Sequence, residues 1–352
     1  MPSWIAEIAR AGGGKISFER FMELALYHPE HGYYVRHISD IGRCGDFSTA
    51  LTIGDALVQS ITNWARSEAR RLKLPNLNII ELGGGGGQLA RGILGKTWLW
   101  DRAKYQIVEI SESLRQKQER EIRSRNLSWQ NTIEAALDAV NGQALVIANE
   151  FVDAFPCKRF ECTLAGWREI LLSFDGDEWR EQLSSRLETI ESSAFSIQAA
   201  IGQRVETLVS YRQWLAKMTR HLSRGALLII DYGGWPEEIY GRRPRGTMRA
   251  FFRHERLEEM GIYLRAGRQD LTADVNFLDL RNWGEAMGLT TEGYVNQAEF
   301  IRMWNRSGWR PRSKADEYLS DQSAMGGAVR VLHQRKSSEF GVRGLRVRGA
   351  ES

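Results

Sequence analysis

The feature that most constrains the fold of this chain is a series of short apolar runs separated by helical stretches. Each run is about five residues long, which is typical of strands that are buried on both faces of a parallel sheet. The runs are residues 78–82, 105–109, 144–148 and 226–230, and residues 113–123 and 210–222 between them have helical periodicity. Such an alternation forms βαβ units with right-handed crossovers. The sequence therefore predicts an α/β fold with a doubly wound, mostly parallel sheet.

The first apolar run ends in a glycine cluster that predicts a ligand site. Gly83, Gly85 and Gly87 lie between Glu81 and Gln88. Ligands of open α/β sheets bind beyond the carboxyl ends of the strands, and glycines let the backbone turn tightly and approach a ligand. The spacing is G-x-G-x-G, because Gln88 stands where the dinucleotide fingerprint requires its third glycine. A tight strand–helix turn without a ligand is the alternative.

An acidic residue at the end of the second run narrows the class of ligand. Glu109 lies 26 residues after Gly83, where a carboxylate accepts hydrogen bonds from both hydroxyls of a ribose. A nucleoside without a pyrophosphate, such as S-adenosylmethionine, needs no helix N-terminus to bind phosphate. The glycine spacing therefore favours a methyltransferase over a dehydrogenase. A solvated carboxylate at the end of a strand is the alternative for Glu109.

Composition and charge exclude several other classes of protein. No apolar run approaches the roughly 18 residues that a membrane span requires, and the first fourteen residues lack the apolar core of a secretory signal. The net charge is +4, of which residues 335–352 carry +3, so the body of the chain does not predict nucleic-acid binding. Cys157 and Cys162 have no second ligand pair for zinc. We expect a cytoplasmic protein without a metal site.

The chain is predicted to have three parts. Residues 1–75 form a helical extension that contributes to the site, in which Ser17 caps a helix that ends before Pro29 and an amphipathic helix follows around Trp64. Residues 76–334 form the catalytic core, with insertions at about 158–205 and 234–270. The first insertion has the pattern of antiparallel strands over residues 158–182, and the second that of a long functional loop. Residues 335–352 form a basic tail that we expect to be disordered.

An ordered set of motifs between Phe18 and His333 resembles the MidA-like methyltransferases, which are assembly factors of respiratory complex I. The motifs are FMELALYHP at residues 21–29, GYY at 32–34, GDFSTA at 45–50, VEIS at 108–111, NEFVDAFP at 149–156, DYG at 231–233, GTMR at 246–249 and DLT at 270–272. The resemblance implies a class I, Rossmann-like methyltransferase fold, S-adenosylmethionine as cofactor and a protein acceptor. The implied acceptor is an arginine on a core subunit of complex I. The implied location is the bacterial cytoplasm, or the mitochondrial matrix in a eukaryote.

Three short segments depart from the pattern of that family. Residues 84–87 are all glycine where the family usually has Pro-Gly-Arg-Gly, and Leu51 and Thr52 replace Pro-Glu. Residues 274–277 read Asp-Val-Asn-Phe where the family favours His-Val-Asp-Phe. We therefore expect a divergent member of the family.

Methyl transfer to an arginine requires carboxylates, because the guanidinium has a pKa above about 12 and arrives protonated. Asn149 and Glu150 end the third apolar run, and Asp153 follows them. We expect Glu150 to orient the acceptor and help to remove its proton, Asn149 to position it and Asp153 to supply the second carboxylate. A surface charge is the alternative for Glu150, and a helix N-cap is the alternative for Asp153.

The other candidate residues follow from the glycine motif and from the resemblance. The cofactor-binding candidates are Asp46, Phe47, Glu81, Gly83, Gly85, Gly87, Glu109, Ile110 and Asn149. The substrate-binding candidates are Asp231, Tyr232, Arg249, His254, Asp270, Thr272 and Asp274. An Asx-turn is the alternative for Asp46, and a solvated loop residue is the alternative for His254. A small-molecule methyltransferase and a non-catalytic assembly factor that binds a partner subunit are the alternative functions.

Overall fold

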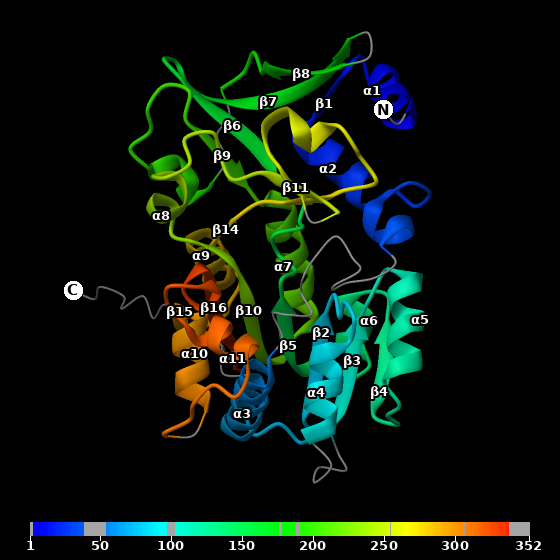
Figure 1. Ribbon diagram of the computed structural model, residues 1–352, viewed down its shortest axis with the longest axis vertical. Helices are drawn as coiled ribbons and strands as arrows, with labels where there is room; N and C mark the ends of the chain where they lie inside the picture. The colour runs from blue at the N-terminus through cyan, green and yellow to red at the C-terminus, as the bar shows by residue number, and fades with distance from the viewer. Residues whose placement is uncertain are drawn as a thin grey trace, which may run out of the picture.

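The predicted parallel sheet forms one half of the molecule (Figure 1). The structure is a computed structural model that describes residues 3–38, 54–96, 103–175, 178–187, 191–253, 255–305 and 307–337. The strand order is β15 (Thr290–Asn296), β16 (Val329–Lys336), β10 (Arg224–Gly234), β5 (Gln143–Asn149), β2 (Asn78–Leu82), β3 (Lys104–Val108) and β4 (Leu127–Gln130). Strands β10 to β4 are parallel, whereas β16 is antiparallel to both of its neighbours. The predicted α/β fold is confirmed.

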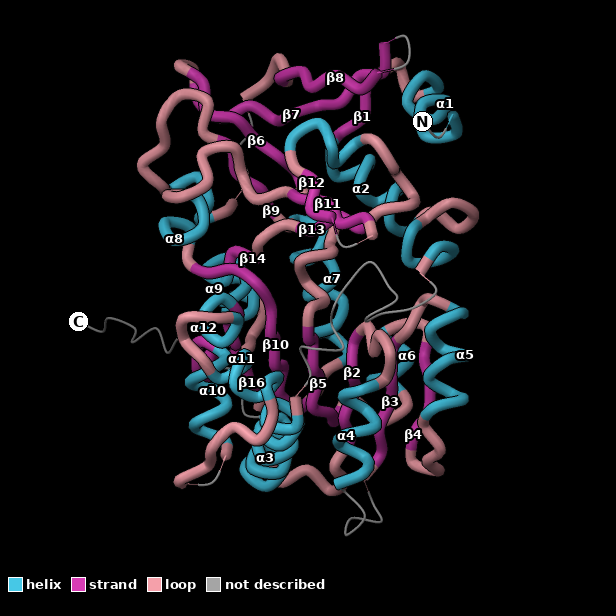
Figure 2. Tube along the Cα trace, in the orientation of Figure 1, coloured by secondary structure: helices cyan, strands magenta, loops and turns pink. Residues whose placement is uncertain are grey.

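Helices cover both faces of this sheet, as a doubly wound fold requires (Figure 2). One face packs against α3 (Asp55–Arg71), α4 (Gln88–Lys96) and α10 (Gln297–Trp304), and the other against α6 (Ile133–Asp138), α7 (Val209–His221) and α9 (Phe277–Ala286). Successive side chains of a strand point to opposite faces. Val146 accordingly belongs to one buried cluster and Ile147 to the other. The further helices are α5 (Glu112–Glu121), α11 (Lys314–Ser320) and α12 (Met325–Ala328).

A second, antiparallel sheet lies above the parallel one in Figure 1. Its order is β1 (Lys15–Ser17), β7 (Gly166–Asp175), β6 (Lys158–Thr163) and β9 (Arg204–Thr207), and β8 (Glu178–Leu183) pairs with β7. Helices α1 (Ser3–Ala11) and α2 (Phe18–Tyr27) pack against β7, and Ser17 caps α2 by accepting the N–H of Arg20 at 3.1 Å. The N-terminal residues therefore join the second sheet, whereas α3 packs on the first.

Residues 234–270 are not the long loop that the sequence predicts. They contain α8 (Pro236–Tyr240), β11 (Arg249–Phe252), β12 (Glu255–Leu257) and a 3₁₀ helix, η4 (Glu259–Tyr263). Strand β11 pairs with β12 and with β13 (Asp270–Thr272) in a small antiparallel sheet, and β14 (Val275–Asn276) pairs with β10. Each of these elements is at most five residues long, which is too short to show a hydrophobic period.

The end of the described chain also differs from its prediction. Arg335 and Lys336, which the sequence assigns to the basic tail, are the last residues of β16. Arg335 is buried because its guanidinium pairs with Glu68 of α3, Nε to Oε2 at 2.9 Å. Within the described ranges, no helix is both long enough and apolar enough to cross a bilayer. In the same ranges, no group of three His, Cys, Asp or Glu side chains is placed to hold a metal ion.

Candidate active site

The loops that follow β2, β3, β5 and β10 lie at one edge of the parallel sheet, which faces the antiparallel sheet (Figure 1). The strand register brings them together: Leu82 is opposite both Val108 and Ala148, and Asn149 is opposite Ile230. Because the carboxyl ends of parallel strands meet at one edge, these four loops lie next to one another. Asp46, Phe47 and His254 lie outside the described residues.

The glycine turn after β2 has the backbone that its sequence predicts. Gly83, Gly85 and Gly87 have φ values of +61°, +53° and +76°, a region that residues with a side chain rarely adopt. Gly84 has an ordinary φ, but a side-chain carbon there would lie 2.6 Å from Cγ2 of Ile107. Ile107 of β3 therefore leaves no room for a side chain at position 84, where the family usually has proline.

Glu109 lies beside this turn and is buried. Its carboxylate accepts the backbone N–H of Ser111 at 2.9 Å and the side-chain amide of Gln118 at 3.4 Å. Burial raises its pKa to about 7, although hydrogen bonds from Ser111, Gln118 and the backbone of Gly85 oppose that rise. Ile110, the next residue, is 51% exposed. A carboxylate acceptor and an exposed apolar side chain thus lie together at the end of β3.

Two further groups support this half of the site. Gln118 of α5 donates to the carbonyl oxygen of Gly85 at 2.8 Å and accepts the indole N–H of Trp129 at 2.8 Å. Glu81 is buried in the sheet below the turn, where the hydroxyl of Tyr105 donates to it at 2.8 Å. Burial raises the pKa of Glu81 to about 8. Gln118 therefore links the glycine turn to Glu109, a link that the sequence does not reveal.

The turn at residues 149–153 is held by a carboxylate from the neighbouring strand. Oδ2 of Asp231 accepts the backbone N–H groups of Phe151, Val152 and Asp153 at 3.2, 2.8 and 3.2 Å. Its Oδ1 accepts the N–H of Tyr232 at 2.8 Å, and the side chain is fully buried. Burial raises the pKa of Asp231 well above its usual value. Asp231, predicted to bind substrate, is thus engaged with the backbone and shapes the turn.

Within that turn, Glu150 has a φ of +47°, in the left-handed region. A residue with a side chain is held there only when its surroundings impose the conformation, and such residues cluster at functional sites. Its backbone N–H donates to the carbonyl oxygen of Ile230 at 2.8 Å. The charge of Glu150 contributes to the raised pKa of Tyr232, after the larger effect of burial. No helix begins at Asp153, so the N-cap alternative for that residue is not what the structure shows.

Three aspartates and one arginine form the opposite side of the site. Arg249 is buried, pairs with Asp274 and lies with its guanidinium carbon 6.0 Å from the ring centre of Tyr232. Burial raises the pKa of Asp153 to about 6; the charge of Arg249 opposes this, and that of Asp274 adds to it. Burial also raises the pKa of Asp270, to about 8. Carboxylates and a buried cation therefore interact directly across this space.

Asp270 has one oxygen engaged and one oxygen open. Its Oδ1 accepts the hydroxyl of Tyr34 at 2.6 Å, whereas its Oδ2 is buried and has no hydrogen-bond partner among the described residues. The hydroxyl oxygen of Thr272, on the same strand, is also buried without such a partner in that part of the chain. Buried polar atoms are normally hydrogen-bonded. Among the described residues, both atoms therefore lack the partner that buried polar atoms normally have.

Two tyrosines from the N-terminal segment complete the site. Tyr27 at the end of α2 donates to the carbonyl oxygen of Ala154 at 2.9 Å. Its ring stacks on that of Tyr34, which lies in the π-helix η1 (Tyr33–His37), with ring centres 5.6 Å apart. The charges of Asp270, Asp153 and Glu109 all contribute to the raised pKa of Tyr27, after burial. Tyr27 therefore links the end of α2 to the turn at Ala154 and to Tyr34.

The sequence of the chain matches that of a known protein family. The family described as "Putative S-adenosyl-L-methionine-dependent methyltransferase" matches residues 53–295, a range that holds the glycine turn, Glu109, Glu150 and Asp270. The chain belongs to this family. It is thus an enzyme that uses S-adenosylmethionine, as the glycine spacing and Glu109 predict.

This methyltransferase is similar in sequence or in structure to several other proteins. The protein arginine methyltransferase NDUFAF7, mitochondrial, of Mus musculus is 26% identical over 93% of this chain and 79% of its own length. The Danio rerio protein of the same name is 28% identical over 82% of this chain and 73% of its own. A Burkholderia thailandensis protein solved with bound S-adenosyl-homocysteine has the same fold, with a TM-score of 0.84, 24% identity, and coverage of 97% of this chain and 92% of its own.

The methyltransferase contains site residues that sequence reasoning missed. Tyr27 and Tyr34 lie in motifs of the family resemblance, but nothing in their spacing connects them to Asp270. Gln118 lies within a polar helix without any distinguishing pattern. The residues where this chain departs from its family have structural partners. Asp274 pairs with Arg249, and Asn276 caps α9 by accepting the N–H of Leu278 at 3.1 Å.

Proposed function

We propose that this methyltransferase methylates an arginine side chain of a protein. The observation that carries the proposal is Oδ2 of Asp270, which is buried without a hydrogen-bond partner among the described residues, while the charge of Asp153 contributes to the raised pKa of Asp270. A guanidinium presents several N–H donors in a fixed plane and pairs with carboxylates. The names of the mouse and zebrafish relatives support the same acceptor.

The cofactor half of the site fits S-adenosylmethionine. We propose that Glu109 would accept the ribose hydroxyls and that Ile110 would pack against the adenine, beside Gly83, Gly85 and Gly87. Glu109 already lies against the turn, and Ile110 exposes an apolar side chain at the required strand end. Bound there, S-adenosylmethionine supplies an activated methyl group on a sulfonium.

In our proposal the aspartates and Glu150 bind the positively charged acceptor and accept its proton. An arginine arrives protonated, so the enzyme has to bind a cation and then accept its proton. Asp270 and Asp153 have raised pKa values because they are buried, and a bound guanidinium favours their ionised forms. In our proposal these two residues orient the guanidinium, and Glu150 accepts the proton. The turn that carries Glu150 and Asn149 is fixed by Asp231, so both are held in place before the acceptor binds.

The partner and location are proposed from the family. We propose that the acceptor is a subunit of respiratory complex I, as for the MidA-like methyltransferases that the motifs resemble. The named relatives are mitochondrial. For a bacterial chain the corresponding place is the cytoplasm, and for a eukaryotic one the mitochondrial matrix.

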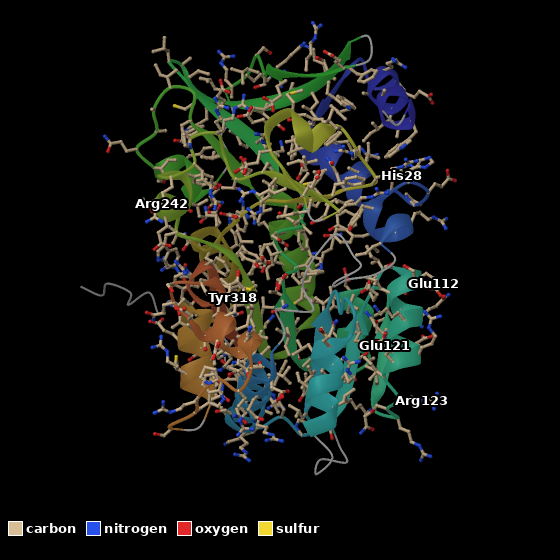
Figure 3. All side chains as sticks on the ribbon, in the orientation of Figure 1. His28, Glu112, Glu121, Arg123, Arg242 and Tyr318 are labelled. Carbon is tan, nitrogen blue, oxygen red and sulfur yellow. The ribbon has the colours of Figure 1, made fainter. Side chains whose placement is uncertain are left out.

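The experiment that tests the catalytic assignment uses tritiated S-adenosylmethionine and an extract from cells that lack this enzyme. Glu150→Gln is expected to abolish transfer to protein while cofactor affinity, measured by calorimetry, stays within about threefold. Glu112→Gln is the matched control, because Glu112 is exposed on α5 (Figure 3). Normal transfer by Glu150→Gln would remove Glu150 from the proposal.

A further inference from the structure

The charge of the chain is concentrated in one segment. Residues 242–268 contain eight arginines and three glutamates, a net charge of +5 against +4 for the whole chain. The rest of the chain is therefore slightly acidic. Arg249 is buried in the site, whereas most of the other arginines of this segment are exposed. The sequence as a whole does not predict a polyanion-binding protein, but this segment has a strong local positive charge.

Contacts place several of these arginines near the active site or near one another. Arg243 shares Asp274 with the buried Arg249. Arg245 pairs with Glu259 of η4, and Arg256 pairs with Glu258. The backbone N–H of Arg268 donates to the carbonyl oxygen of Arg265 at 2.8 Å. Figure 1 shows β11 between the antiparallel sheet and the edge of the parallel sheet, and η4 packs against β11. We define the arginine surface as the following six residues: Arg243, Arg245, Arg253, Arg256, Arg265 and Arg268.

Two arginines of this surface lie next to the aromatic ring of Phe252. The guanidinium carbons of Arg253 and Arg265 lie 5.2 and 4.5 Å from the ring centre of Phe252. Met260 and Leu264, between them in the chain, expose 47% and 48% of their surface. Large apolar side chains that are exposed among arginines are typical of protein interfaces. The surface is therefore both basic and apolar.

The small sheet connects this surface to the acceptor residues. Strand β11 begins at Arg249, opposite Thr272, and continues to Phe252 beside Arg253. Asp270 is opposite Phe251 of the same strand. A polypeptide bound at Asp270 would thus reach the arginine surface within a few residues, because one extended residue spans about 3.3 Å.

We propose that the arginine surface binds an acidic segment of the protein acceptor, adjacent to the residue that is methylated. This inference rests on the proposed function. The carboxylates inside select a cationic side chain, and the arginines at the rim select acidic residues next to it. A nucleic acid is the other polyanion that such a surface could bind. The acidic interior repels a phosphate backbone, and Met260 and Leu264 offer it no complementary group, so the structure favours a peptide.

The test uses three fluorescent peptides of equal length, each with one central arginine. Their flanks are acidic with one leucine, neutral with one leucine, or basic with one leucine. Binding is measured by polarisation in the presence of S-adenosyl-homocysteine. The acidic peptide is expected to bind at least about tenfold more tightly than the neutral one, and added salt is expected to reduce the difference.

Variants with reversed charge test whether the arginine surface causes the preference for the acidic peptide. The double variant Arg253→Glu/Arg268→Glu is expected to lose the preference for the acidic peptide, and Arg253→Gln/Arg268→Gln to reduce it. Arg310→Glu/Lys314→Glu is the matched control, since it makes the same change of charge at exposed positions on and before α11 and is expected to retain the preference. Circular dichroism confirms that each variant is folded.

Four results would overturn the inference or separate it from the proposed function. Equal binding of the three peptides contradicts an acidic docking site. An oligonucleotide that binds more tightly than the acidic peptide, and only to the unreversed surface, replaces the peptide with a nucleic acid. Methyl transfer to the same three peptides is followed in parallel samples that contain S-adenosylmethionine in place of S-adenosyl-homocysteine. Transfer to arginine without a flank preference leaves the proposed function standing and removes the docking site. A flank preference without transfer supports the docking site and removes the proposed function.

Discussion

The hydroxyl of Tyr34 donates a hydrogen bond to Oδ1 of Asp270 over 2.6 Å, although the two residues are 236 positions apart in the chain. Tyr34 belongs to the N-terminal segment that joins the antiparallel sheet, and Asp270 begins β13. The bond leaves Oδ2 of Asp270 buried without a partner among the described residues. The N-terminal segment thus orients one oxygen of this carboxylate.

Removing the hydroxyl of Tyr34 is expected to weaken acceptor binding more than cofactor binding. Tyr34→Phe leaves a buried carboxylate with one donor fewer, which costs about 1–3 kcal/mol of stability. The KM for the protein acceptor is expected to rise roughly tenfold and the affinity for S-adenosylmethionine to stay unchanged. Steady-state kinetics and calorimetry measure the two effects. Tyr318→Phe is the control because Tyr318 is 52% exposed (Figure 3), and an equal effect of both variants would contradict this role.

Asp231 is expected to be required for the geometry of the turn at Glu150. Asp231→Ala removes the acceptor of three backbone N–H groups in a buried site, and we expect a loss of about 2–4 kcal/mol in the free energy of unfolding. Asp231→Asn keeps one acceptor oxygen and is expected to cost less. Urea denaturation measures both. Methyl transfer by the folded Ala variant at the normal rate would show that the turn does not need this support.

The glycine turn is expected to tolerate no side chain at Gly87. Its φ is +76°, and a side-chain carbon would lie 2.6 Å from Cδ1 of Ile122. Gly87→Ala is therefore expected to weaken S-adenosylmethionine binding at least about tenfold and to destabilise the fold by more than about 1 kcal/mol. Gly95→Ala on the following helix is the control, because a side chain there meets nothing within 4 Å. It is expected to stabilise the helix by up to about 1 kcal/mol. Calorimetry and thermal unfolding separate the two outcomes.

Stability without ligand is expected to fall as the pH rises from about 5 to about 8. The pKa values of Glu109 and Asp270 are about 7 and about 8 in the folded chain, above their ordinary values of 4.5 and 3.8, because both are buried. Between those limits the folded state binds more protons than the unfolded state, so the free energy of unfolding decreases with pH. Urea denaturation at pH 6 and pH 8 measures the change. Asp270→Asn is expected to flatten it, and a rise in stability from pH 6 to pH 8 would contradict the assignment.

The affinity for S-adenosylmethionine is expected to rise with pH, whereas the stability without ligand falls. Only the ionised form of Glu109 accepts both ribose hydroxyls, and that form predominates above about pH 7. S-adenosylmethionine should therefore bind more tightly at pH 8 than at pH 6, and Glu109→Gln should bind it weakly at both. Calorimetric titration at the two values provides the comparison. An affinity of the native enzyme that does not change with pH would show that Glu109 does not titrate at the ribose.

The sequence predicts the parts of the molecule that local patterns determine. The four apolar runs became β2, β3, β5 and β10, and Ser17 caps α2 as expected. The glycine spacing and Glu109 were sufficient to predict the cofactor class. Each of these signals is contained in a short window, where periodicity, capping or turn geometry acts directly on neighbouring residues.

The rest of the site depends on contacts between distant segments. Residues 249–252 form a strand because β13, outside their own segment, pairs with them. Tyr34 and Asp270 meet only after both sheets have assembled. Asp231 has the sequence position of a ligand-binding residue, but the turn after β5 supplies three N–H groups that its carboxylate accepts. No local pattern contains that information.

If the acceptor is an arginine of a protein, the methylated product is a modified arginine, and its chemical identity can be determined. The enzyme and tritiated S-adenosylmethionine are incubated with an extract of cells that lack the enzyme, and the labelled protein is hydrolysed and its amino acids are separated. We expect label in methylated arginine, which disappears with Glu150→Gln and persists with Glu112→Gln. Label in another amino acid, or in small molecules alone, would contradict this expectation.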